Sequence, residues 1–339
     1  MKVCQILAGN EDGGLEKHTV ELSKELQKEG IDVTVIAHQD FEKDFEGVSF
    51  IPLDLSRGRN NVFILFQLYK ILKKENFDIV HTQANKAKAM VMRLKFFLKS
   101  KIVSTLHNYK KNIRIFENSD FVITVSDKIG EKLKTKNKIT IYNGVKFRNN
   151  NNLSVDLYQK YDIAKEKFII CSVARLTTVK RFDILLEALS KLNNVHLILV
   201  GGGEEESRLK QLGKKLNILD KVTFTGNLEN DQVQRIISSS KLFVMTSDNE
   251  GFPYTFVETM FCKTPFLSTA VSDIEKIIGK KYIIPFGDSQ ATAKKIRFIE
   301  ENYEEVLRDY QSIFKFSEEK FTLNTMTKET INIYNKVLK

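Results

Sequence analysis

The sequence has 339 residues, of which 42% are hydrophobic and 28% charged, which is typical of a soluble globular protein long enough for two domains. It contains no run of about eighteen apolar residues and no apolar signal-peptide segment after Met1, so we expect neither a membrane-spanning helix nor secretion. Three isolated cysteines, Cys4, Cys171 and Cys262, form no CxxC pair, which favours buried, reduced thiols in a cytoplasmic protein.

The net charge of +10 is concentrated in one part of the chain. Residues 86–138 contain fourteen Lys or Arg and only four Asp or Glu. A basic face can attract nucleic acid, an anionic substrate or an anionic membrane leaflet, although solvated lysines give the same composition. No RNP-like aromatic pattern, zinc finger or helix-turn-helix accompanies the charge, so we do not expect a nucleic acid partner.

The first elements predict a parallel sheet. Residues 2–8 indicate a buried strand, 9–14 a glycine-bearing loop, 15–29 a helix and 31–37 a second strand. This βαβ pattern is typical of α/β proteins. Gly13 and Gly14 would let the backbone approach a bound group at the helix start, but the full G-x-G-x-x-G is absent, and a tight turn without a ligand explains the pair equally well.

Further strands are predicted at 48–51, from residue 78, at 101–106, 121–125 and 139–142, and a helix at 61–76. Ser126 has the position of a helix N-cap. The segment 86–99 predicts an amphipathic helix that is basic on one side and apolar with aromatic residues on the other. This composition fits a membrane-surface helix, and a helix packed on the core is the alternative. The residues assigned to acceptor or membrane contact are Lys86, Lys88, Arg93, Lys95, Phe96, Phe97 and Lys99.

His107 follows the strand at 101–106. A histidine at the carboxyl end of a parallel strand faces the ligand crevice, although it can also simply cap the strand. The polar run 149–152 reads as a linker that ends a first domain near residue 150.

The second half repeats the pattern of the first. Strands are predicted at 168–173, 195–200, 222–225 and 242–245, helices at 182–192, 207–216 and 231–239, and a final helix at 323–338. We therefore expect two doubly wound α/β domains with a site in the cleft between them. The loop after the strand at 168–173 contains Arg175, Lys180 and Arg181, and two such cations can hold a diphosphate whose negative charge grows as its bond to a sugar breaks. A solvated basic loop is the alternative.

Residues 241–269 carry the strongest pattern. An apolar strand is followed by a polar turn, then Gly251-Phe252-Pro253, then a helix through residue 260. Glu250 and Glu258 could accept hydrogen bonds from sugar hydroxyls at either end of a ligand whose phosphate lies at the helix start, although many such pairs are merely solvated. No Asp-x-Asp pair, HExxH or Cys/His cluster occurs, and no Walker A loop follows Gly201, so we expect neither a metal nor an NTPase.

The ordered motifs resemble those of the GT-B glycosyltransferases, within them the large retaining family four, nearly from end to end. They are GNEDGGLEKHTVELSKEL, DIVHTQ, TLHN, IYNGV, SVARLTTVKRFDILLEAL, LILVGGG, VTFTGNL and EGFPYTFVETM, whose two glutamates match the family's E-x7-E element. Departures are Thr259, where Ala is common, and Lys263-Thr264-Pro265, where Gly often precedes the proline.

The resemblance implies a role for each matching residue. Arg175 and Lys180 would grip the diphosphate, Glu258 the ribose and Glu250 the donor sugar, while His107 would lie beside the transferred sugar. The remaining donor-binding residues would be Gly13, Gly14, Asn227, Leu228, Gly251, Phe252, Pro253, Tyr254 and Thr255. It also implies two Rossmann-like domains, 1–150 for the acceptor and 151–320 for the donor, with a helix at 321–339 that crosses back to the first.

The expected protein is a cytoplasmic retaining hexosyl- or N-acetylhexosaminyl-transferase without a cofactor. It would use a nucleotide-sugar, a UDP-sugar above all, and a saccharide acceptor, lipid-linked by preference, in bacterial surface polysaccharide synthesis. It could also lie on the inner face of the cytoplasmic membrane. A UDP-sugar 2-epimerase of similar fold and a non-catalytic sugar-nucleotide-binding scaffold are the alternatives.

Overall fold

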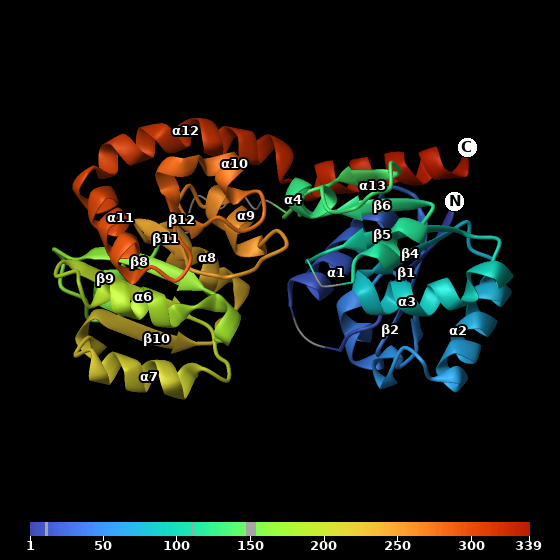
Figure 1. The fold of residues 1–339 in the computed structure, drawn as a ribbon, viewed down its shortest axis with the longest axis horizontal. Coiled ribbons are helices and arrows are strands. Elements are labelled where there is room, and N and C mark those ends of the chain that lie inside the picture. The colour runs from blue at the N-terminus through green and yellow to red at the C-terminus, as the bar shows by residue number, and fades with distance from the viewer. Residues whose placement is uncertain (11–12, 110–111, 147–153) are drawn as a thin grey trace. The chain divides into compact units, whose positions relative to one another are not determined.

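The chain divides into two compact units in the computed structural model, which describes all residues except 11–12, 110–111 and 147–153 (Figure 1). Unit 1 comprises Met1–Lys146 together with Phe321–Lys339, and unit 2 comprises Phe147–Lys320. The expected linker at 149–152 lies outside the described residues.

Unit 1 is built on a seven-stranded parallel sheet with the strand order β3-β2-β1-β4-β5-β6-β7. Its strands are β1 Lys2–Leu7, β2 Asp32–Ala37, β3 Ser49–Pro52, β4 Ile79–Gln83, β5 Lys101–Leu106, β6 Phe121–Thr124 and β7 Lys138–Thr140. Its helices are α1 Gly14–Lys28, α2 Val62–Glu75, α3 Ala84–Leu94, α4 Asp127–Gly130 and α13 Leu323–Leu338, and α3 is followed by the 3-10 turn η3, Lys95–Phe97.

Helices cover both faces of this sheet, which explains why its central strands are apolar over most of their length. On one face α1 and α13 pack their apolar side chains against the strands, among them Leu22 and Ile333. On the other face α2 and α3 do the same, among them Leu68 and Met90. Asn61 begins α2 because its side-chain oxygen accepts hydrogen bonds from two backbone N–H groups of the first turn.

Unit 2 has a six-stranded parallel sheet with the strand order β10-β9-β8-β11-β12-β13. Its strands are β8 Phe168–Val173, β9 Val195–Val200, β10 Val222–Gly226, β11 Leu242–Met245, β12 Phe266–Thr269 and β13 Ile283–Ile284. Its helices are α5 Leu157–Lys160, α6 Phe182–Leu189, α7 Glu206–Lys215, α8 Asn230–Ser239, α9 Tyr254–Phe261, α10 Ile274–Ile278, α11 Ser289–Glu301 and α12 Tyr303–Lys320. Both units are thus Rossmann-like, which confirms the predicted fold class.

Several local predictions were wrong. The helix predicted at 86–99 begins earlier, at Ala84, and ends at Leu94, after which the chain turns through η3. Ser126 precedes α4, but its hydroxyl makes no capping hydrogen bond. Cys4 and Cys171 are buried as expected, whereas Cys262 is partly exposed.

Candidate functional site

The centre of unit 2 contains a pocket at the point where the strand order reverses. The chain passes from β8 outward to β10 on one side and then resumes with β11 on the other side of β8. Loops at such a switch point diverge and leave room for a ligand at the carboxyl ends of the strands. The pocket there is lined by Ser172, Val173, Ala174, Lys180, Phe182, Phe243, Met245, Thr246, Ser247, Glu250 and Thr255. Three predicted site residues, Lys180, Glu250 and Thr255, therefore meet in one pocket.

Lys180 and Glu250 form an ion pair in this pocket. The Lys180 Nζ donates to Glu250 Oε1 over 2.6 Å, and both side chains are largely buried. The loops that carry them are tied together, because the single hydrogen of the Thr246 hydroxyl is shared between the carbonyls of Lys180 and Arg181, whose oxygens lie 2.9 and 3.0 Å from Oγ1. The backbone N–H of Asp248 also donates to the Val179 carbonyl. A cation and a carboxylate are thus held side by side on a fixed frame.

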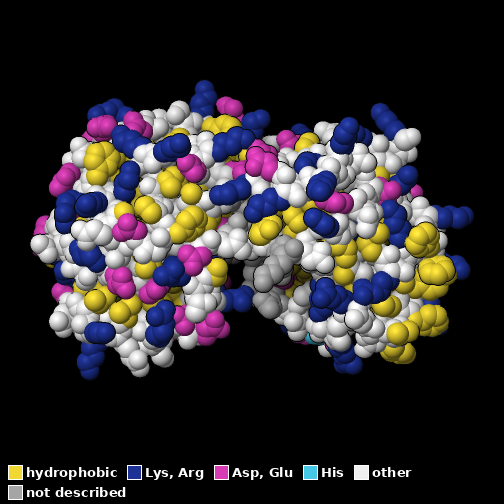
Figure 2. Space-filling view, in the orientation of Figure 1, with side chains coloured by type: hydrophobic (Ala, Val, Ile, Leu, Met, Phe, Trp, Pro, Cys, Tyr) yellow, Lys and Arg dark blue, Asp and Glu magenta, His cyan; other side chains and the backbone are white. Residues whose placement is uncertain are grey.

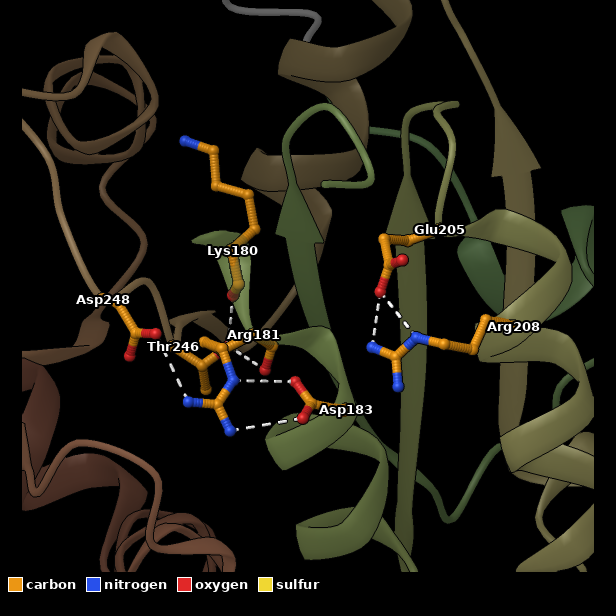
Figure 3. A network of polar contacts seen from close by, with 7 residues as sticks. All are labelled: Lys180, Arg181, Asp183, Glu205, Arg208, Thr246 and Asp248. Atoms are coloured by element: carbon orange, nitrogen blue, oxygen red, sulfur yellow. Dashed lines mark hydrogen bonds and ion pairs between the residues drawn. The ribbon is translucent and has the colours of Figure 1, made fainter. Parts of the chain in front are cut away.

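Arg181 follows Lys180 in the sequence, but its side chain bonds acidic neighbours and does not line the pocket. Its backbone is left-handed, with φ of 51°, and its guanidinium bonds Asp183 at 3.1 and 3.3 Å and Asp248 at 3.3 Å (Figure 3). The Asp183 hydrogen bonds raise the pKa of Arg181 above its usual range. The Lys180 side chain points away from this pair in the same view. Arg175 lies exposed in the loop that follows β8.

The predicted loop and helix around Glu258 are formed as expected from residue 251 onward. Gly251 and Phe252 are buried, Pro253 is the N-cap of α9, and Tyr254 begins the helix. The Ser272 hydroxyl donates to the Gly251 carbonyl and so fixes the loop that follows Glu250. Glu258 lies one turn into α9 and is partly buried. The free N–H groups of a helix start are suited to an anion, and Thr255 of this first turn lines the pocket.

The glycine loop after β9 lies against the loop after β8. Gly201 has φ of +127°, and a Cβ there would lie 2.1 Å from the Ala174 carbonyl oxygen. The neighbouring Gly202 donates its N–H to Asn227 Oδ1 at 2.8 Å. This bond holds the predicted residue Asn227, which is exposed, while Leu228 beside it is partly buried.

In unit 1 the strand order reverses between β1 and β4. At this edge Gly13 is the N-cap of α1 and has an extended backbone, and Gly14 is the first residue of that helix. Both glycines are exposed. His107, another predicted site residue, follows the carboxyl end of β5. Its Nε2 lies 2.7 Å from Gln83 Oε1 at the end of β4. Burial and the neighbouring histidines His18 and His81 hold the pKa of His107 well below its usual value, so the ring is neutral near pH 7.

A buried polar network behind His107 was not predicted. The ring of His18 meets that of His107 edge to face at 4.6 Å, and His18 Nδ1 lies 3.1 Å from Asn143 Oδ1. His81 Nδ1 lies 2.6 Å from the hydroxyl of Tyr334 in α13, and its Nε2 lies 2.7 Å from Thr105 Oγ1. The sequence does carry a signal for this network, because polar residues interrupt otherwise apolar buried strands at Gln5, His81, Gln83 and Thr105.

The basic segment 86–99 divides into different environments. Lys88 is buried, where desolvation and then Lys95 lower its pKa to about 7, so the prediction that it contacts an acceptor or membrane was wrong. Lys86 donates to the Ser56 carbonyl at 2.7 Å and Lys95 to the Asn118 carbonyl at 2.9 Å. Arg93 and Lys99 are exposed, as are Phe96 and Phe97.

The described part of the chain holds neither a candidate metal site nor a membrane-spanning helix. Within residues 1–10, 13–109, 112–146 and 154–339, no group of three His, Cys, Asp or Glu side chains is placed to hold a metal ion. Over the same ranges, no helix has both the length and the apolar character needed to cross a membrane.

Comparison with known proteins matches both units to glycosyltransferase families. Residues 12–148 match the profile "Glycosyltransferase Family 4" and residues 156–312 match "Glycosyl transferases group 1". A lipopolysaccharide core biosynthesis glycosyltransferase, LpsE of Rhizobium meliloti, is 26% identical over 309 residues, or 88% of each chain. The N-acetyl-alpha-D-glucosaminyl L-malate synthase of Bacillus anthracis is 26% identical over 332 residues, or 83% of each.

Two solved structures share the fold. A glycosyltransferase of Rickettsia africae superposes with a TM-score of 0.84 and 22% identity, covering 100% of this chain and 98% of that one. Anabaena HepE, solved with UDP and glucose, gives a TM-score of 0.83 and 18% identity over 99% and 100% of the two chains. With both of its Rossmann-like units matched in this way, the chain belongs to the GT-B glycosyltransferases of group 1 and family 4.

Proposed function

We propose that this glycosyltransferase moves a hexosyl or N-acetylhexosaminyl group from a UDP-sugar to a lipid-linked saccharide, with retention of configuration, during synthesis of a bacterial surface polysaccharide. The observation that carries the proposal is the convergence of Lys180, Glu250 and the start of α9 in the pocket at the switch point of unit 2. A cation, a carboxylate and a helix start are the three groups that a sugar diphosphate would use.

Each group has a distinct part in the proposed reaction. As the bond from the sugar to the diphosphate breaks, negative charge grows on the leaving oxygens. Lys180, Arg175 and the backbone N–H groups of Phe252, Tyr254 and Thr255 stabilise that charge more strongly in the transition state than in the bound donor. The acceptor hydroxyl forms the new bond to the sugar, and its proton passes to the departing diphosphate.

The sugar and nucleoside are held by the remaining predicted residues. Glu250 accepts hydrogen bonds from donor-sugar hydroxyls and Glu258 from the ribose hydroxyls. Asn227 and Leu228 flank the base. In unit 1, Gly13 and Gly14 at the start of α1 serve the phosphate, and the neutral His107 lies beside the transferred sugar.

Relatives support the choice of donor and pathway. Anabaena HepE was solved with UDP and with UDP-glucose, and a pneumococcal O-GlcNAc transferase with UDP and GlcNAc. Relatives in Rhizobium meliloti and Escherichia coli are named for lipopolysaccharide core and O-antigen biosynthesis. Such products are built on lipid, which favours a lipid-linked acceptor and an enzyme working at the inner face of the cytoplasmic membrane.

The test combines binding with turnover. In a thermal-shift screen of nucleotide-sugars, a true donor raises the melting temperature because it binds only the folded state. The substitutions Lys180→Ala and Glu258→Ala should each abolish most donor turnover, whereas Lys210→Ala, which removes an exposed lysine of α7 paired with Glu206, should not.

Three results would contradict the proposal. The first is full activity in both site variants, and the second is an absence of stabilisation by every nucleotide-sugar tested. The third is conversion of the UDP-sugar to an epimer without any acceptor, which would point to the epimerase instead.

A further inference from the structure

Unit 1 exposes five large apolar side chains on two neighbouring segments. Val62, Phe63 and Phe66 are 78%, 67% and 52% exposed on α2, while Phe96 and Phe97 of η3 are 99% and 66% exposed. The segments touch, because the ring of Tyr69 in α2 meets that of Phe97 edge to face at 5.8 Å. These five residues are here named the aromatic ridge. Exposed aromatic side chains gathered in this way mark a binding surface.

The side chains of the aromatic ridge are not needed to pack α2 against the sheet. α2 already packs Ile64, Leu68 and Leu72 against the sheet, so Val62, Phe63 and Phe66 lie on its outward side. Figure 2 shows hydrophobic side chains on the surface over α2, next to Lys and Arg side chains. The sequence pattern indicates the segment 86–99 alone, and the structure adds the exposed apolar side chains of α2.

The surroundings of the ridge are strongly basic. Residues 55–101 contain eleven Lys or Arg, of which Lys88 is buried, and two acidic residues, Glu75 and Asp78. Both acids are occupied by Lys2, through its Nζ at 2.8 Å from Glu75 and its backbone N–H at 2.7 Å from Asp78. Lys70 lies over the ring of Phe66 at 4.7 Å, and Lys73 lies over that of Tyr69 at 5.4 Å.

We propose that the aromatic ridge inserts into the interfacial region of an anionic lipid bilayer, with the surrounding lysines and arginines on the lipid headgroups. Exposed phenylalanines gain by leaving water for the acyl boundary, and cations gain from the negative surface potential. A second copy of the chain is disfavoured as the occupant, because two such basic surfaces would repel each other. The proposal does not depend on the sugar that is transferred.

Vesicle flotation tests the ridge. The full chain should float with phosphatidylglycerol–phosphatidylcholine vesicles, bind pure phosphatidylcholine weakly, and lose binding as salt is raised. Replacing Phe63, Phe66, Phe96 and Phe97 by Ser should reduce binding by about tenfold or more. Serine at Phe286 and Phe316, two exposed phenylalanines of unit 2, is the matched control and should change nothing. An unchanged thermal melt establishes that each variant is folded.

Charge reversal gives an independent measurement. The triple substitution of Lys70, Lys73 and Lys74 by Glu keeps the phenylalanines and should also reduce binding by about tenfold or more. The proposal is overturned if the wild-type chain ignores anionic vesicles, or if the serine variant binds them as the wild type does. It is equally overturned if the wild type is a dimer in size-exclusion chromatography that the serine variant converts to a monomer.

A second inference rests on different contacts, the hydrogen bonds that end at His107. Gln5 and Gln83 are both buried, and Gln83 Nε2 donates to Gln5 Oε1 at 2.8 Å. Gln5 Nε2 in turn donates to the Tyr334 hydroxyl at 3.1 Å. In this arrangement of the two amides, the atom that Gln83 presents to His107 Nε2 is its carbonyl oxygen, which can only accept.

We infer that Gln83 is a positioning residue that keeps the proton of neutral His107 on Nε2 and leaves Nδ1 as the acceptor of the ring. A hydroxyl of the transferred sugar would then donate to Nδ1, a step that rests on the proposed function. The assignment itself rests on the Gln83 amide oxygen that faces His107 Nε2 at 2.7 Å.

Nitrogen NMR on the histidine-labelled protein tests the tautomer directly, since the sequence has only five histidines and a His107→Asn variant identifies the signal. The expected spectrum has a protonated Nε2 and an unprotonated Nδ1. Gln83→Leu removes the acceptor and should give a mixture of tautomers and a lower kcat with little change in the KM for the donor. Gln67→Leu on α2, outside the network, should change neither.

The outcomes distinguish the positioning role of Gln83 from the role of His107 in the proposed function. A wild-type proton on Nδ1, or an unchanged tautomer in Gln83→Leu, overturns the role of Gln83 whatever the activity. The predicted tautomer together with a His107→Asn variant of normal activity keeps the positioning but refutes the role of His107 in the proposed function.

Discussion

Mild acid should destabilise unit 1 through its buried histidines. Burial lowers the pKa of His18 to about 4, partly offset by its hydrogen bond to Asn143. Burial, and then the charge of His18, lower the pKa of His81 to about 3. In the unfolded chain both rings titrate near 6.5, so below that pH the unfolded state binds protons that the folded state refuses.

The sign and size of the effect follow from this difference. The stabilisation is fully present above about pH 6.5 and is lost as the pH falls toward the folded pKa values, at about 1.4 kcal/mol per pH unit for each histidine. At about pH 5 each ring therefore costs about 2 kcal/mol, and the two together about 4 kcal/mol, a large part of the stability of an ordinary domain.

Urea unfolding over a pH series measures the loss. Carboxylates titrate in the same range, so the useful quantity is the difference between the wild type and His81→Gln, whose side chain stays neutral. His81→Gln should be less stable at neutral pH, because hydrogen bonds to Tyr334 and Thr105 are lost, but its stability should fall less steeply between about pH 6.5 and about pH 5. If the free energy of unfolding falls equally steeply with pH in the wild type and in His81→Gln, the reasoning is refuted.

Two further predictions concern stability. Tyr334→Phe removes the hydroxyl that lies 2.6 Å from His81 Nδ1 and accepts from Gln5 Nε2, so it should cost about 1–3 kcal/mol in the free energy of unfolding measured with urea, and a loss below the error of that measurement would show that the contacts are dispensable. Gly201→Ala should cost more than about 3 kcal/mol, because it adds a Cβ 2.1 Å from the Ala174 carbonyl at a φ of +127°. Gly47→Ala, at a φ of +83° with no atom within 4 Å, isolates the backbone strain and should cost only about 1–2 kcal/mol; equal losses for the two alanines would contradict the steric argument.

Sequence patterns predicted most of the sheet because parallel strands are buried on both faces. β8, β9 and β11 begin and end at the predicted residues, since each is a short apolar run between polar loops. The loop cluster of unit 2 was also predictable, because Lys180, Glu250 and Thr255 all follow strand ends in the sequence. Their meeting in one pocket depends only on the strand order.

Other features depend on contacts that no local pattern encodes. The pairing of Lys180 with Glu250 joins residues seventy positions apart. Lys88 lies in a basic segment that looks exposed, yet its place on α3 turns it into the interior. The helix α12 was not predicted, although its sequence carries a helical pattern. Its buried residues recur at helical spacing: Val306, Tyr310, Phe314 and Ser317.

The assignment of α13 to unit 1 has a consequence for how the protein is made. Unit 1 is interrupted by the whole of unit 2, and its core includes Met326, Ile333 and Tyr334. On the ribosome the first 146 residues therefore emerge without one of the two helices that cover one face of their sheet, while all segments of unit 2 emerge before that helix does. Unit 2 can finish folding first, and the incompletely covered sheet of unit 1 stays open to chaperones and proteases until translation delivers α13.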